Sequence, residues 1–315
     1  MYSYYGGNRM GIVVIGPTFV DIKGFPTNGF IANGRNEGTI KTVHGGVSRN
    51  IAEDIANLEL RPTFVSLIDD VYGDDVLARL QRHKINTKYI KNVKDGMGSW
   101  LAIFNEDGDV VASISKRPNV LPIIDIIDEY GDEIFSECDS VSLELDTDSK
   151  LLRKIFTYAK KYNKRIYACV GNMAIAVDRR DLFKEVDCVV CNKEEAGILF
   201  MEECEKLNPD ELSKLVLEKI KAADIKSIVV TMGPQGAVYA TKDGDCGFIP
   251  AFEVKVVDTT GAGDSFYAGV CAGLTYGKTL QEACEIGTKL AASVVQSTDN
   301  VCPRFLPSEF GLDNK

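Results

Sequence analysis

The stretch Asp258-Thr259-Thr260-Gly261-Ala262-Gly263-Asp264-Ser265-Phe266 is the most informative part of this chain. A β-rich run from Phe252 to Val257 leads into it, and a segment of helical length, Ala262 to Tyr276, follows it. Glycines at such a strand-to-helix junction let the backbone turn tightly and aim successive N–H groups at one point. The first helical turn adds unpaired donors and the positive end of the helix dipole. We therefore expect an anion-binding site at this junction.

Asp264 follows the second glycine of this site directly. A carboxylate there repels a phosphate, but it is well placed to take the proton from a hydroxyl that attacks a phosphoryl group. An isolated Gly-x-Gly-Asp is more often a plain turn with a solvated acid, whereas the full stretch is far more specific. It predicts a phosphotransferase with Asp264 as the base. The backbone N–H groups from Thr260 to Gly263, which include those of Gly261 and Ala262, would stabilise developing charge.

The complete stretch resembles the second signature of the ribokinase-like (PfkB) carbohydrate kinases, and the resemblance extends over roughly residues 11–305. It implies a three-layer α/β/α fold with a mostly parallel sheet and a small β-sheet lid. It also implies ATP and Mg²⁺ as cofactors, with K⁺ at a monovalent-cation site. The acceptor would be a primary hydroxyl of a sugar or nucleoside.

Composition bounds the class of protein. With 315 residues and 45% hydrophobic content, the chain is long enough for one large α/β domain. A net charge of -10 and a pI of about 4.9 argue against nucleic acid or an anionic membrane as a partner. The chain has neither an apolar run of about 18 residues nor a signal-peptide core, so we expect a cytoplasmic protein. Residues 1–10 are expected to be a disordered lead-in, and residues 11–310 the kinase domain.

Cysteine and histidine add little chemistry. Nine cysteines are scattered along the chain, and Cys188-Val189-Val190-Cys191 is a C-x-x-C within an expected strand. Residues three apart in a strand point to opposite faces, and no second pair completes a zinc set, so these thiols are expected to be buried and inert. The chain has two histidines, His44 and His83, which argues against histidine-based catalysis.

Short β-branched runs alternate with helical patterns along most of the chain, which predicts a parallel sheet with ligands beyond the C-terminal ends of its strands. The expected strands are Ile12–Ile15, Thr63–Leu67, Ser140–Leu145, Arg165–Cys169, Cys188–Cys191 and Ser227–Thr231. The expected helices are Val47–Leu58, Asp75–His83, Asp148–Tyr162, Pro209–Ala222, Ala262–Tyr276 and Leu280–Gln296.

Two segments, about 23–43 and 98–115, interrupt this alternation. Their expected extended pieces are Gly29–Ala32, Gly38–Val43, Gly98–Asn105 and Val110–Ser115, and Asp107-Gly108 is a hairpin-turn signal. Together they predict a β lid that keeps water from the acceptor and offers a surface for a homodimer. The alternative is a pair of surface hairpins without a role.

Three places are candidates for binding the acceptor. Gly45-Gly46-Val47-Ser48-Arg49-Asn50 has the form of the family's first signature, and the resemblance implies that Gly45, Gly46 and Asn50 contact the sugar. Asp21, after the first strand, is positioned to accept hydrogen bonds from two sugar hydroxyls. Glu144, at the end of another strand, resembles a further sugar-contacting acid of the family, with a solvated loop carboxylate as the alternative.

Two further motifs point to ATP and its metal. Asn192-Lys193-Glu194-Glu195 matches the family's Asn-x-x-Glu, which implies that Asn192 and Glu195 position Mg²⁺, and it also predicts a helix cap. Thr231-Met232-Gly233-Pro234-Gln235-Gly236 fits the family's Thr-x-Gly-x-x-Gly, so Thr231, Gly233 and Gly236 are expected along ATP.

The resemblance places residues 291–300 against the adenine and Asp258 with Thr260 at the monovalent-cation site; Thr260 is also expected at ATP. Gly273 to Thr279 superficially resembles a Walker loop, but its glycine spacing is short and it follows a helix. Thr279 and Glu282 instead predict a capping box.

The identity of the acceptor is the most open question. Gly45 to Glu53 resembles pseudouridine kinases in particular, and Trp100 or Phe19 is suited to stack on a base. Phe19 replaces a common family asparagine, and the basic pair Lys116-Arg117 also departs from that subgroup. The alternatives are therefore a free-sugar kinase of ribokinase or fructokinase type, a phosphosugar kinase, or a non-catalytic nucleotide-binding regulator.

Overall fold

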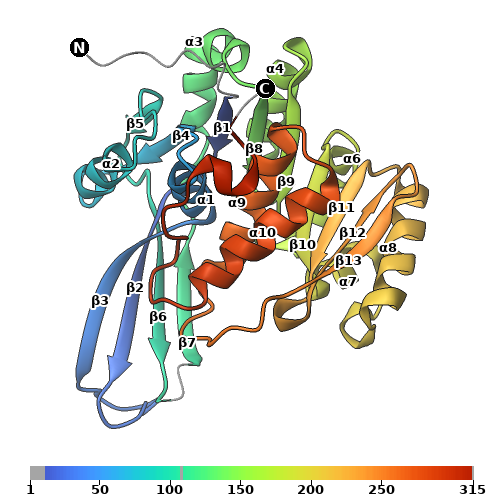
Figure 1. Cartoon of the computed structure of the whole chain (residues 1–315). Coiled ribbons are helices and arrows are strands. Elements are labelled where there is room, and N and C mark those ends of the chain that lie inside the picture. Colours follow the sequence, from blue (N-terminus) through green and yellow to red (C-terminus); the bar gives the residue numbers. More distant parts are fainter. Residues whose placement is uncertain (1–10, 107–108, 314–315) are drawn as a thin grey trace.

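The computed structural model describes residues 11–106 and 109–313, so the predicted lead-in and the Asp107-Gly108 turn lie outside the described residues. Within the described ranges, nine strands form the main sheet, in the order β13-β12-β11-β10-β9-β8-β1-β4-β5 (Figure 1). They are β1 (Ile12–Ile15), β4 (Thr63–Ile68), β5 (Ile90–Asn92), β8 (Ser140–Glu144), β9 (Arg165–Cys169), β10 (Cys188–Asn192), β11 (Ser227–Thr231), β12 (Gly236–Thr241) and β13 (Cys246–Pro250). In this order, the seven strands from β11 to β5 pair in parallel with their neighbours. The remaining strands β12 and β13 pair antiparallel, β12 with β11 and β13 with β12.

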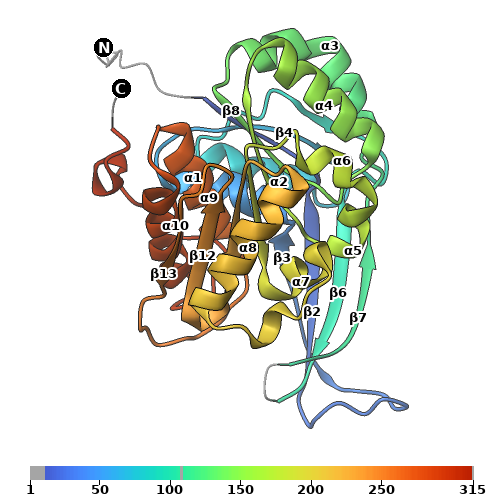
Figure 2. The same cartoon turned by 90° about the vertical axis from the view of Figure 1, so that its right-hand side faces the viewer.

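Helices cover both faces of this sheet, which gives the predicted three layers (Figures 1 and 2). One face carries α1 (Val47–Asn57), α2 (Gly73–Arg82), α9 (Ala262–Thr275) and α10 (Leu280–Val294). The other carries α3 (Pro122–Ser136), α4 (Ser149–Lys161), α5 (Met173–Ala176), α6 (Arg180–Phe183), α7 (Lys193–Phe200) and α8 (Pro209–Ala223). The six strands and six helices expected from the alternating pattern are all present, with ends that differ by a few residues.

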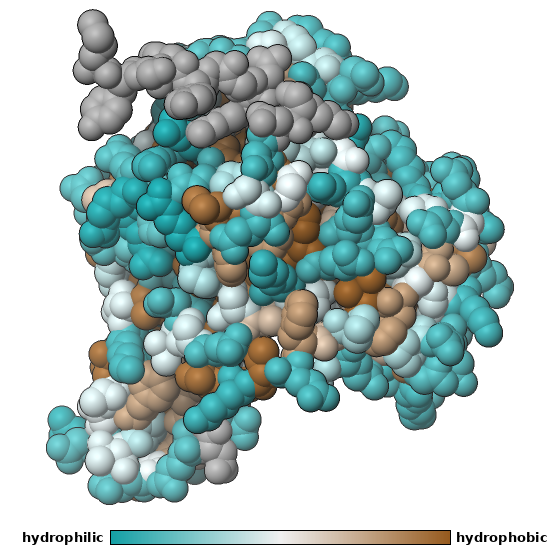
Figure 3. All heavy atoms as spheres, viewed as in Figure 1, coloured by the Kyte–Doolittle hydropathy of each residue, from teal (hydrophilic) through white to brown (hydrophobic). Residues whose placement is uncertain are grey.

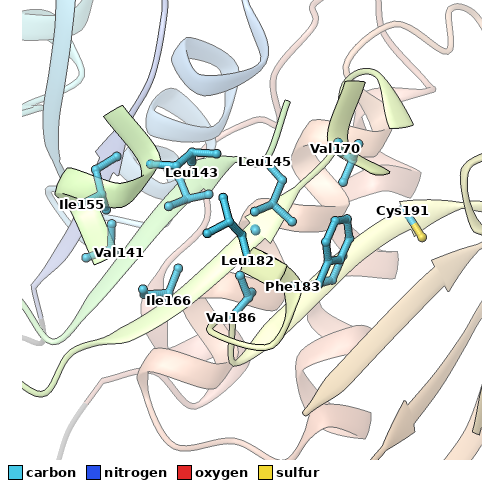
Figure 4. Close-up of a cluster of buried hydrophobic side chains, with 14 of the residues drawn as sticks. Val141, Leu143, Leu145, Ile155, Ile166, Val170, Leu182, Phe183, Val186 and Cys191 are labelled. Atoms are coloured by element: carbon cyan, nitrogen blue, oxygen red, sulfur yellow. The ribbon is translucent and has the colours of Figure 1, made fainter. Parts of the chain in front are cut away.

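The core lies in two layers because successive strand side chains alternate between the faces. Val141 and Leu143 of β8 pack under the α3–α4 layer, while Ile12 and Val14 of β1 pack against the α1–α9 layer. Figure 4 shows part of the first layer, where apolar side chains from several strands and Phe183 meet. The alternation also separates Cys188 from Cys191, which belong to different layers, and both are buried free thiols.

A second sheet in the described residues contains β3 (Gly38–Gly45), β2 (Phe19–Pro26), β6 (Gly98–Phe104) and β7 (Val110–Lys116), in that order. We call this sheet the lid. It projects from the main body (Figures 1 and 2), as predicted. Its first strand begins earlier than expected, so Asp21 belongs to the lid, and the expected extended piece at 29–32 is not a strand.

One expected strand of the main body is absent, and several elements were missed. The β-rich run Phe252 to Val257 forms no strand, although Val257 N donates to the Val295 carbonyl. The sheet ends at β13, so this run has no neighbouring strand with which to pair. The helices α3, α5 and α6, the short strand β5 and the antiparallel pair β12–β13 were not predicted.

The capping box predicted at Thr279 is present, with Glu282 N donating to the hydroxyl and Thr279 N to the Glu282 carboxylate. The Walker-like string is therefore a helix end followed by a helix start. Among the described residues, no helix is both long and apolar enough to cross a membrane.

Candidate active site

A cavity of about 740 Å³ lies between the lid and the C-terminal edge of the main sheet. Parallel strands leave such a crevice where they end, and here the lid forms its opposite wall. Asp21, Asn50, Glu144 and Asp264 meet in it, although they come from four separate elements. The predicted residues Gly46 and Thr260 also line this cavity, and Thr260 does not line the cavity expected for ATP.

The first turn of α9 carries Asp264, and Gly261 immediately precedes the helix. Gly261 has a φ of 82°, and a Cβ at this position would lie 2.0 Å from the Asn300 carbonyl oxygen, so only glycine fits. The amides of Gly263 and Asp264 are in the first turn, where the helix offers no acceptor, whereas the Ala262 amide donates to the Thr259 carbonyl at 3.3 Å. The sequence thus builds an anion-binding helix start with a carboxylate inside it.

Asn50 holds the Asp264 carboxylate in place. Its Nδ2 donates to Asp264 Oδ2 at 2.6 Å, and its Oδ1 accepts from Arg49 and from Asn300. Because both donors fix the amide oxygen, the amide cannot flip, and its NH₂ group must face Asp264. One Asp264 oxygen is thereby occupied, and the other is left for a ligand.

Burial raises the pKa of Asp264 to about 6, although the Asn50 hydrogen bond and the nearby Arg49 charge both act to lower it. A carboxyl with a pKa near 6 is ionised at neutral pH and is a stronger base than an ordinary aspartate. This is the range in which general bases work well.

Two glycines make room for Asp21. A Cβ on Gly45 would lie 2.3 Å from Asp21 Oδ1, so the carboxylate occupies the space that a side chain would fill. Gly46 has a φ of 96°, and a Cβ there would meet the Phe19 amide at 2.9 Å. Gly45 thus leaves room for the Asp21 carboxylate, and Gly46 itself lines the cavity. Burial raises the pKa of Asp21.

Glu144 ends β8 at the sheet edge, and its Oε1 accepts from Ser48 N at 3.2 Å and Ser48 Oγ at 2.5 Å. Burial, with repulsion from Asp146 and Asp264, raises the pKa of this carboxyl to about 7. Glu144 is therefore held in the cavity wall by Ser48, at the end of a strand and not in a loop.

A buried ionic group supports Asn50 from behind, and sequence reasoning missed it. Arg49 and Glu53 form an ion pair of 2.8 Å with both side chains fully buried. Arg79 of α2 closes the group, with its Nε at 3.0 and 2.9 Å from the two Glu53 oxygens. Removing one partner of such a buried pair strongly destabilises the folded protein, because the other charge is left without a partner. Its only sequence signal is the i, i+4 spacing on α1.

The far end of the cavity combines aromatic and charged side chains. Asp21 and Trp100 are neighbours across β2 and β6 and so share the lid face that lines the cavity, together with Phe19. Asp146, which the sequence analysis missed, accepts from Arg117 at 3.0 Å and from the Gly171 amide at 3.0 Å. Its signal was its place just after β8, at the same sheet edge as Glu144.

A second cavity, of about 670 Å³, opens on the other side of the α9 start. Thr231, Gly233 and Gly236 line it, as do Ala262 and Gly263 from the anion site. Ala291, Ala292 and Val295 form its apolar wall, whereas Asn300 lies apart from it beside Asn50. The two cavities therefore meet at the helix start that carries Asp264.

Asn192 and Glu195 form a reciprocal capping box at the start of α7, at 2.8 Å in both directions. Asn192 also pairs in register with Thr231, which places it at the edge of the sheet near the second cavity. Burial, and to a smaller extent the neighbouring Asp146 charge, raise the pKa of Glu195. Asp258 Oδ1 accepts from the Thr260 amide at 2.8 Å, which helps lower the pKa of Asp258.

Comparison with known proteins agrees with this geometry. The family model described as pfkB family carbohydrate kinase matches residues 10–302. This chain belongs to the PfkB family. It is therefore a phosphotransferase with an alcohol group as acceptor, and the predicted kinase class is confirmed.

The relatives of this PfkB kinase include nucleoside kinases. It is 32% identical to the guanosine-inosine kinase of Exiguobacterium acetylicum over 299 residues, covering 92% of this chain and 95% of the relative. The pseudouridine kinase of Escherichia coli is a more distant relative, at 23% identity with 83% and 82% coverage. The ribokinase of Arabidopsis thaliana, solved with ribose and ATP, has the same fold, with a TM-score of 0.81, 20% identity, and coverage of 98% and 99%.

Proposed function

We propose that this PfkB kinase transfers the γ-phosphate of ATP to the 5′-hydroxyl of a nucleoside. The observation that carries the proposal is the convergence of Asp21, Asn50 and Glu144 on Asp264 in one cavity that also contains Trp100. The three polar side chains suit a ribose, and the aromatic group suits a base.

In this mechanism the acceptor hydroxyl lies against the free oxygen of Asp264, which takes its proton as the oxygen attacks the γ-phosphorus. The bond from that phosphorus to the β–γ bridging oxygen breaks, and ADP leaves. The amides of Gly261 and Gly263 face the charge that develops on the transferred group, whereas the Ala262 amide donates to the Thr259 carbonyl. Asp21 and Glu144 orient the sugar, and the lid excludes water.

ATP is proposed to occupy the second cavity, with its phosphates toward Gly263 and its adenine against the apolar wall that includes Val295. The described residues contain no cluster of three or more metal-ligating acids, histidines or cysteines. Mg²⁺ would therefore be held by the phosphates and by waters positioned by Glu195 and Asn192, which fits its preference for water and few carboxylates. Asp258, with a lowered pKa, and Thr260 offer oxygen ligands for K⁺.

A nucleoside is favoured over a phosphosugar by the state of the basic pair. Lys116 pairs with Asp95 at 2.7 Å, and Arg117 pairs with Asp146 at 3.0 Å, so a phosphate would have to displace a carboxylate from each cation. Pseudouridine was the first expectation from the sequence. The similarity to a guanosine-inosine kinase adds purine nucleosides, and we propose guanosine and inosine as the first acceptors to test.

The test is a side-by-side measurement of kcat/KM for guanosine, inosine, pseudouridine, ribose, fructose and fructose 6-phosphate. We expect a nucleoside to be preferred, and Trp100→Ala to lower kcat/KM for nucleosides by about 10-fold while sparing ribose, because stacking contributes roughly 1–3 kcal/mol per base. Tyr72→Ala, which removes an aromatic ring outside the cavity, is the control. Preference for a free sugar or a sugar phosphate would reject the nucleoside proposal.

We also propose that the lid mediates a homodimer. Its face away from the cavity carries Ile22, Leu101 and Ile114 in one row across β2, β6 and β7, with Ile40 and Ile103 beside them. Ile40 and Ile114 are 77% and 69% exposed, and apolar side chains gather over the lid in Figure 3. Ile114→Lys should yield a monomer by light scattering, while Val257→Lys, a change at an exposed valine outside the lid, should not.

A further inference from the structure

A third cavity, of about 670 Å³, lies between the C-terminal halves of α1 and α2 and the segment that follows α10. Two carboxylates line it, Glu59 and Asp299, against five cationic side chains: Arg61, Arg79, Arg82, Lys84 and Arg304. In a chain with a net charge of -10, this is a local reversal of sign. The volume is in the range of small-molecule sites, about 300–1,000 Å³.

The two carboxylates that line this cavity, Glu59 and Asp299, do not neutralise its five cationic side chains. Glu59 is shared by Arg304 and Lys84. Among the described residues, Arg61 and Arg82 have no hydrogen bond or ion pair to an acidic side chain. An arginine guanidinium can donate two parallel hydrogen bonds to the oxygens of one phosphate, and it keeps its charge at all relevant pH values. The cavity is therefore complementary to an anion larger than a single carboxylate.

Arg79 connects this cavity to the catalytic base. Its guanidinium, about one-third exposed, reaches the cavity on one side and binds Glu53 on the other. From Glu53 the contacts run through Arg49 to the Asn50 amide oxygen, and Asn50 donates to Asp264. A charge that draws Arg79 outward would thus act on the side chain that fixes Asn50.

We propose that this cavity is an effector site for a phosphate-bearing small molecule with at least two negative charges, such as a nucleotide or pyrophosphate. The bound phosphate competes with Glu53 for Arg79. Arg49 then turns toward Glu53, its hold on the Asn50 amide weakens, and acceptor binding is impaired. The site is separate from both cavities that meet at Asp264, since Arg61 and Arg82 line neither of them.

Binding is tested by calorimetric titration of AMP and of pyrophosphate into the full-length protein. The Arg61→Gln/Arg82→Gln double variant removes the two unpaired cations. The control is Arg153→Gln, which removes an exposed arginine of α4, on the other face of the sheet. Its surface ion pair contributes little to stability. Melting temperatures confirm that all three proteins are folded.

We expect at least one probe to bind in this cavity in the wild type and in the control. In the double variant, binding at this site should be absent or at least about 10-fold weaker. That is the loss expected from one charged hydrogen bond. Whether AMP or pyrophosphate binds identifies the source of the phosphate. Equal binding by all three proteins, or no additional site for either probe, would overturn the proposal.

Coupling is tested by the acceptor KM at saturating ATP, with and without the probe that binds. The expected change is a rise of about 5-fold or more in wild type and control, the lower end of typical coupling, and none in the double variant. An unchanged KM at a saturating concentration of the probe would contradict the coupling through Arg79.

Discussion

Asn50 and Asp264 lie far apart in sequence, yet the Asn50 Nδ2 donates to Asp264 Oδ2 at 2.6 Å. The contact joins the two signature motifs of the chain, one at the start of α1 and the other at the start of α9. Because Arg49 and Asn300 hold the Asn50 oxygen, the contact sets which Asp264 oxygen is free. The base is therefore oriented before any ligand arrives.

The rate should depend on pH through Asp264. Its pKa in the free enzyme is raised to about 6, and only the ionised form can accept a proton, so kcat/KM for the acceptor should be constant above about pH 7 and fall as pH drops through 6. Asn50→Ala removes a hydrogen bond that lowers this pKa, so the fall should move to higher pH. Asn92→Ala, which breaks a matching contact with Asp70 outside the cavity, should leave the profile unchanged. All three proteins are measured in a Glu144→Gln background, so that the titration of Glu144 does not contribute to the profile.

Gly45→Ala should impair acceptor binding more than stability. The new methyl would lie where the Asp21 carboxylate now sits, 2.3 Å from Oδ1, and would displace it. We expect the acceptor KM to rise by about 10-fold or more, equivalent to losing one charged hydrogen bond, while the KM for ATP is unchanged. Gly24→Ala in the neighbouring lid strand β2 is the control, because its methyl would meet only ordinary contacts. Equal effects from both variants would contradict a role for Gly45 in placing Asp21.

Stability should fall as the solution becomes alkaline because of Asp54. This buried carboxyl accepts from Ser265 Oγ at 2.8 Å and Cys302 N at 2.6 Å, and burial raises its pKa to about 8. Its pKa in the folded state exceeds its ordinary value of 3.8 in the unfolded state. The stabilisation that its bound proton gives the folded state is therefore complete below about pH 4 and is lost as pH rises through 8. We expect the Tm to fall between pH 7 and 9, and Asp54→Asn, which mimics the neutral form, to flatten that fall. A fall just as steep in the variant would assign it to other groups.

The sequence predicted most of the main sheet because its signals are local. Parallel strands such as Ile12–Ile15 are short β-branched runs, and Thr279 with Glu282 is a local cap. The run Phe252 to Val257 misled for a physical reason: β-branched residues favour a strand only where a partner strand exists, and the sheet ends before them.

The candidate site divides in the same way. Asp21, Asn50, Glu144 and Asp264 follow strand ends or helix starts that parallel topology brings to one edge, so their meeting was predictable. The contacts of Arg79 with Glu53 and of Asn300 with Asn50 were not, because they depend on how α2 and the segment after α10 pack. No local pattern encodes such packing.

Single-turnover and steady-state kinetics of Asp264→Asn show whether Asp264 is the catalytic base. Asp125→Asn is the control, since it also removes an aspartate from the first turn of a helix, but outside the cavity. We expect a kcat at least about 10²-fold below wild type for Asp264→Asn, with ATP still bound, and a normal kcat for the control. A turnover near that of the wild type in Asp264→Asn would contradict it.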